Sequence, residues 1–175
     1  LLGASTATGT AATPGAPADL VPGASVTAFL VQGDLKLGAT GTVTEVFPDG
    51  RFVAFGHPYL GAGELELPVG PAEIVAVVPS SYQSFKVGNG AAPRYRITND
   101  RDSGVGGRTD RTAATTPVTV VVDGDGRPPR EFRFEVASHP KLLPVLAGLV
   151  ADASMTAADP TPRDRLLSFR IALDT

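Results

Sequence analysis

The stretch that decides the fold covers residues 40–60 and reads TGTVTEVFPDGRFVAFGHPYL. Two β-rich segments, 41–47 and 51–55, flank the turn at 48–50, because Val, Thr and Phe suit a pleated surface and an Asp-Gly pair suits a tight hairpin. The second segment ends in a Gly-His-Pro string, where the proline removes a ladder donor. The pattern therefore predicts a hairpin that presents His57 at a strand end, where many catalytic side chains lie.

Further β-rich segments surround this hairpin. A first pair of strands is expected at 25–32 and 35–39, and continuous apolar character over 26–31 indicates a strand that is covered on both faces. Residues 117–122 and 131–136 predict a second hairpin. Residues 99–109 are rich in glycine and charge and predict a loop around a short strand. Other strands are expected at 64–67, within 80–87, and at 95–98 and 166–173, and the apolar residues 74–78 predict another buried strand.

One helix is predicted, roughly over residues 140–155, because leucine and valine recur there at helical spacing. Ser138 is the expected N-cap, although Pro144 would move the start one turn later. His139 is interpreted as a helix-start residue rather than a site residue. The fold is therefore expected to be mainly β, an antiparallel barrel or a packed pair of sheets, with one helix on the C-terminal side.

Composition excludes several classes of function. The 175 residues carry a net charge of −3 with no basic stripe, which argues against nucleic-acid binding. There is no cysteine, and the two histidines are far apart, so neither a metal site nor any cofactor is expected. No apolar run reaches the roughly 18 residues of a membrane helix.

The domain organisation is predicted from the first residues. Residues 1–21 are mostly small and without periodicity, which indicates a flexible linker or tail. Residues 22–175 then form a single β-rich domain. Because the chain starts with leucine, we interpret it as a piece of a longer protein.

The 40–60 stretch resembles the histidine-bearing segment of the SpoIVB-type serine peptidases. In that family a Gly-Thr-x-Thr strand, a turn and a strand ending in Ala-x-Gly-His supply the catalytic base. The similarity extends less sharply over residues 22–109. The matching residues here are Gly41, Thr42, Thr44, Ala54, Gly56 and His57.

The resemblance implies a chymotrypsin-like or related β-barrel in which His57 is the general base for a serine nucleophile. The family's Gly-x-Ser-Gly-Ser-Pro string occurs nowhere in this chain. The resemblance thus implies a serine-bearing segment of the same protein upstream of Leu1, and a bacterial, extracytoplasmic or secreted location. Absence of cysteine is compatible with that location.

Other candidate site residues have competing interpretations. Asp100 and Asp102 could orient the imidazole of His57 if folding brings them close, but loop capping is the interpretation that the residue pattern favours. Ser80, Ser81 and Ser84 lack the glycine elbow of a nucleophile. The alternative function is a non-catalytic module that binds a peptide or a neighbouring domain.

Overall fold

The computed structural model describes residues 20–79, 85–124 and 127–159. This part of the chain holds nine strands and one helix. In chain order the elements are β1 (Ser25–Gly33), β2 (Leu37–Val46), β3 (Arg51–Ala54), β4 (Gly63–Val78), β5 (Phe85–Gly90), β6 (Tyr95–Arg101), β7 (Gly104–Arg108), β8 (Thr115–Gly124), β9 (Arg127–Ala137) and α1 (Leu143–Ala158).

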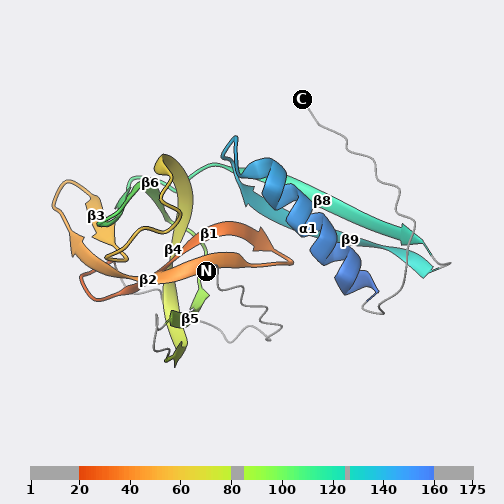
Figure 1. The fold of residues 1–175 in the computed structure, drawn as a ribbon, viewed down its shortest axis with the longest axis horizontal. Helices are drawn as coiled ribbons and strands as arrows, with labels where there is room; N and C mark the ends of the chain where they lie inside the picture. The colour runs from red at the N-terminus through yellow and green to blue at the C-terminus, as the bar shows by residue number, and fades with distance from the viewer. Residues whose placement is uncertain (1–19, 80–84, 125–126, 160–175) are drawn as a thin grey trace.

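Six strands form a closed antiparallel barrel in the order β1-β2-β3-β7-β6-β4, and β4 pairs with β1 to close it. In Figure 1 this barrel is the left-hand part of the molecule, and α1 lies on the right over β8 and β9. Closure leaves no free edge within the barrel itself. The prediction of a mainly β fold with an antiparallel barrel and one C-terminal-side helix is confirmed.

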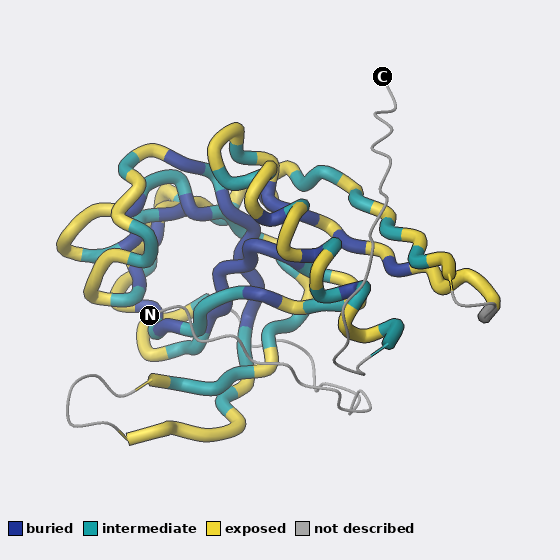
Figure 2. The backbone as a smooth tube through the Cα atoms, turned by 45° about the vertical axis from the view of Figure 1, so that its right-hand side comes forward, coloured by how far each residue is buried: buried dark blue, intermediate teal, exposed yellow. Residues whose placement is uncertain are grey.

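The barrel interior is filled by apolar side chains that alternate along the strands. In Figure 2 the buried residues of the backbone, in dark blue, gather in the middle of the molecule. In β1 every residue from Val26 to Val31 is buried, as expected from its continuous apolar character. Its outer face lies under β5, where a Cβ added to Gly90 would meet the Phe29 ring at 2.4 Å. The least exposed large side chains of the barrel are Val26, Val31, Val43, Phe52, Leu67, Val69, Ile97 and Val105.

The 40–60 hairpin forms as predicted between β2 and β3. Phe47 and Arg51 close it, with the Phe47 amide donating to the Arg51 carbonyl at 2.8 Å. Gly50 has a φ of 79°, which an Asp-Gly turn accommodates.

β4 differs from the prediction of two separate strands at 64–67 and 74–78. It is one strand of 16 residues that continues through Pro68 and Pro71. Its second half leaves the barrel and pairs only with β5, forming a two-stranded ribbon at the bottom of Figure 1. The prediction that 74–78 is buried is wrong, because Val75 is 69% exposed and Val77 is 58% exposed.

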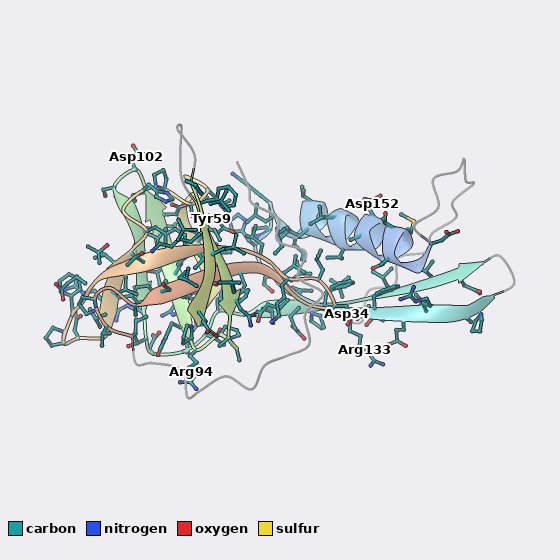
Figure 3. The ribbon with its side chains drawn as sticks, turned by 90° about the horizontal axis from the view of Figure 1, so that it is seen from below. Asp34, Tyr59, Arg94, Asp102, Arg133 and Asp152 are labelled. Carbon is teal, nitrogen blue, oxygen red and sulfur yellow. The ribbon has the colours of Figure 1, made fainter. Side chains whose placement is uncertain are left out.

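The predicted hairpin at 117–136 is confirmed as β8 and β9, which extend the sheet from β1. Its inward face carries Phe132, Phe134 and Val136. Asp34 and Arg133 join this hairpin to the barrel, since the Asp34 amide donates to the Arg133 carbonyl at 3.0 Å and the Asp34 carboxylate accepts from the Arg133 amide at 2.8 Å (Figure 3).

The helix begins one turn after residue 140, at Leu143, with Pro144 in its first turn, where a missing N–H costs nothing. Ser138 is not the N-cap. Its hydroxyl bonds the Thr116 hydroxyl at 2.6 Å, and Leu142 occupies the cap position without a side-chain cap.

Two further predictions concern residues 99–109 and the two ends of the chain. Residues 99–109 were predicted as a loop around a short strand, and they do hold the short strand β7, but residues 99–101 belong to β6 and pair with β7, with Arg101 opposite Gly104 across a tight turn. The strand expected at 166–173 and most of the linker expected at 1–21 lie outside the described residues.

Candidate functional site

The candidate site is built where β3 ends. Phe55 and Gly56 follow the strand with φ values of 73° and 71°, so two successive left-handed residues turn the chain out of the sheet. Glycine adopts this conformation freely, whereas phenylalanine does so rarely. The turn delivers His57 to the surface, where its side chain is exposed.

His57 has a defined hydrogen bond in this position. Its Nδ1 lies 2.8 Å from the carbonyl oxygen of Pro58. A carbonyl oxygen only accepts, so Nδ1 carries the proton in the neutral ring, and Nε2 holds a lone pair. The geometry therefore leaves Nε2 as the basic nitrogen of an exposed imidazole.

Asp100 lies in β6, 2% exposed, and its carboxylate faces the loop that follows His57. It accepts hydrogen bonds from the amides of Tyr59 at 2.7 Å, Leu60 at 2.5 Å and Gly61 at 2.8 Å. Three charge-assisted bonds offset the burial of the carboxylate. Asp100 thus caps the loop that carries His57, and its hydrogen bonds go to that backbone rather than to the imidazole.

Tyr59 packs beneath this loop. Its hydroxyl is buried and has no hydrogen-bond partner among the described residues. Burial, followed by the negative charge of Asp100, raises the pKa of Tyr59 above its ordinary value. The phenol is therefore neutral across the physiological range, and the Tyr59 side chain packs against the apolar core.

The β6–β7 turn lies beside the His57 turn. A Cβ added to Gly104 would lie 2.9 Å from the Ala54 carbonyl oxygen, which shows how closely the two backbones approach. Asp102 is exposed at the tip of this turn (Figure 3). The structure records no hydrogen bond between Asp102 and His57.

The other candidate residues from the sequence are three serines and His139. Ser80, Ser81 and Ser84 lie outside the described residues. His139 precedes α1, and its Nδ1 is buried without a partner among the described residues. The structure therefore brings the Asp100 carboxylate of β6 against the loop that carries His57.

A shallow cavity of about 550 Å³ is lined by residues of β4 and β6. Arg96 lines this cavity, and the Arg96 guanidinium pairs with Glu66 and with Asp110. Arg111 also pairs with Glu66, so the central charges neutralise one another. The cavity is lined by Glu64, Leu65, Glu66, Arg96, Thr98, Asn99 and Arg101.

No group of three or more potential metal ligands occurs within residues 20–79, 85–124 and 127–159. No helix in that same part of the chain is long and apolar enough to cross a membrane.

Phe55 and Tyr59 are residues of this site that sequence reasoning missed. A phenylalanine in the left-handed region has no sequence signature, and the adjacent Gly56 accounts for the turn equally well. Loop capping was the interpretation that the residue pattern favoured for Asp100, but its three donors depend on how β4 and β6 align.

Comparison with known proteins identifies no relative: no family model, no curated protein and no solved structure matches this chain. The fold that the chain itself shows is a closed six-stranded antiparallel β-barrel with one helix.

Proposed function

We propose that the chain is the histidine-bearing portion of a SpoIVB-like serine peptidase, with His57 as the general base for a serine supplied by a segment outside this chain. The observation that supports it is the exposed imidazole at the end of β3, whose Nδ1–H is committed to Pro58 and whose Nε2 is basic. A fold alone hosts many functions, so the proposed activity depends on His57.

The chemistry would run in two stages. Nε2 of His57 accepts the serine hydroxyl proton as the serine oxygen attacks the peptide carbonyl, and the resulting imidazolium then protonates the leaving amine. Water then attacks the carbonyl of the acyl-enzyme, and His57 accepts the water proton and returns it to the serine oxygen as that oxygen leaves. Asp100 contributes indirectly in this scheme, because it holds the backbone of the loop that carries the imidazole.

The test begins with the open reading frame upstream of Leu1 and uses its complete product. A fluorophosphonate probe should label a serine in the complete protein, and His57→Ala should slow labelling by about 10²–10⁴-fold, the usual contribution of a general base. Asp102→Asn, an exposed change on the adjacent turn, should label at the normal rate. Equal labelling of the His57→Ala protein would contradict the proposal.

A second candidate function is a binding module for a peptide or a neighbouring domain of the same protein. The β4–β5 ribbon favours it, because Val75, Val77 and Phe85 are exposed there and β5 pairs on one side only among the described strands. Exposed apolar groups beside an open strand edge suit strand addition. In this case the complete protein takes up no label, and Phe85→Ser weakens capture of the partner segment.

A further inference from the structure

Phe55 is the one non-glycine residue with a positive φ among the described residues. A bulky side chain is disfavoured in this conformation, which persists only where the surroundings hold it. Strain of this kind gathers at functional sites. It occurs here directly after β3 and two residues before His57.

Contacts from β2 hold Phe55 in place. A Cβ added to Gly41 would lie 2.5 Å from the Phe55 ring, so the ring rests directly on the glycine backbone. The Phe55 amide donates to the Thr42 carbonyl at 2.9 Å. The Thr42 hydroxyl in turn accepts from Lys86 of β5 at 2.5 Å, which ties this part of β2 to a third strand.

Phe55 then supports the residues that follow it. Its ring centroid lies 5.9 Å from that of His57 with an interplanar angle of 73°, an edge-to-face contact. It lies 5.8 Å from the ring of Tyr59. The imidazole therefore has two fixed neighbours, the Phe55 ring at its side and the Pro58 carbonyl at Nδ1.

We propose that Phe55, seated on Gly41, is the positioning residue that holds the His57 imidazole against the Pro58 carbonyl and so selects the tautomer with a basic Nε2. The catalytic meaning of this role rests on the proposed peptidase function. The positioning itself is a property of the folded chain. Removing the ring frees the imidazole to rotate, and the Nδ1–H bond to Pro58 is then no longer favoured.

The test measures the His57 tautomer by ¹⁵N NMR of the full 175-residue chain at about pH 8.5, above the usual titration range of histidine. The unaltered chain should show His57 mainly in the Nδ1–H form. Phe55→Asn tolerates the left-handed backbone but lacks the ring, and it should lower the Nδ1–H population at least about twofold. Phe55→Leu, which keeps apolar bulk, should act in the same direction.

The matched control is Phe47→Leu, at the opposite end of the same hairpin, where the ring contacts Arg51 rather than the histidine. It should leave the His57 tautomer unchanged. Gly41→Ala should displace the Phe55 ring and reproduce the effect of Phe55→Asn. The proposal is overturned if His57 in the unaltered chain is mainly Nε2–H, or if folded Phe55→Asn and Phe55→Leu proteins keep the original tautomer population.

The two proposals fail separately. A tautomer shift in Phe55→Asn with no labelling of the complete protein would retain the positioning role and remove the peptidase function. Labelling that depends on His57, with no tautomer shift in Phe55→Asn, would retain the peptidase function and remove the positioning role.

Discussion

At the scale of single residues, Asp100 shows what sequence can and cannot specify. The pattern identified it as a carboxylate that either orients His57 or caps a loop. Choosing between these roles needs the register of β4 against β6, in which Gly63 faces Asp100. That register brings the amides of residues 59–61 to the carboxylate, and nothing local to residue 100 encodes it.

Replacing this carboxylate should destabilise the protein. Asp100→Asn keeps the size but loses the charge and places an amide against backbone donors, so the free energy of unfolding should fall by about 1–3 kcal/mol. Urea denaturation measures the change. Asp102→Asn, on the exposed turn next to it, should change the free energy by less than about 0.5 kcal/mol. Equal stability of the two variants would show that the loop does not depend on the buried charge.

At the scale of elements, the 40–60 hairpin and the β8–β9 hairpin were predictable because each joins alternating segments through a short turn. The single long strand β4 was not predictable, because prolines such as Pro68 and Pro71 usually end a strand. The strand nevertheless continues through both prolines, with Pro68 opposite Arg96 and Pro71 opposite Val26. The exposure of 74–78 likewise depends on where the strand leaves the barrel.

The Arg96–Asp110 pair, which ties β6 to the segment before β8, should respond to acid. The hydrogen bond from Arg96 lowers the pKa of Asp110 from 3.8 to about 2. A lowered folded-state pKa stabilises the fold above the unfolded pKa, and this contribution is lost as pH falls from about 3.8 to about 2.

The carboxyl ¹³C shift of Asp110 gives the titration directly, and the comparison variant is Asp110→Asn. This substitution should flatten the pH dependence of stability in that acidic range and leave its slope above pH 5 unchanged, with the expected effect reduced by solvent exposure. A midpoint for Asp110 near 3.8 in the folded protein would contradict the pairing.

The docking of α1 on the β8–β9 hairpin depends on a few buried side chains. Leu146 is 6% exposed and Leu149 is 43% exposed on the same helix. Leu146→Ala should therefore cost about 2–4 kcal/mol of unfolding free energy, the range for a buried leucine, and Leu149→Ala less than about 1 kcal/mol. Urea denaturation of both variants is the measurement. Equal losses would mean that this face of the helix does not pack as described.

At the scale of the whole molecule, composition and patterning predicted a mainly β chain but left open a barrel or a pair of sheets. Local patterns cannot decide this, because closure depends on pairing β1 with β4, strands far apart in the sequence. The six-stranded barrel provides the rigid frame, and the candidate site lies where β3 and β6 end on it.

β1 pairs with β2 between residues 25 and 31, with β4 over residues 26–28 and with β9 over residues 31–33, so that Val31 faces Val136. During synthesis β1 therefore emerges long before β9, the strand that pairs with its last residues. Until β9 leaves the ribosome, the end of β1 presents unpaired backbone groups and an apolar surface, which is the kind of segment that chaperones protect. Non-local pairing of this kind also slows folding, so the final docking of the β8–β9 hairpin is expected to set the rate at which the chain matures.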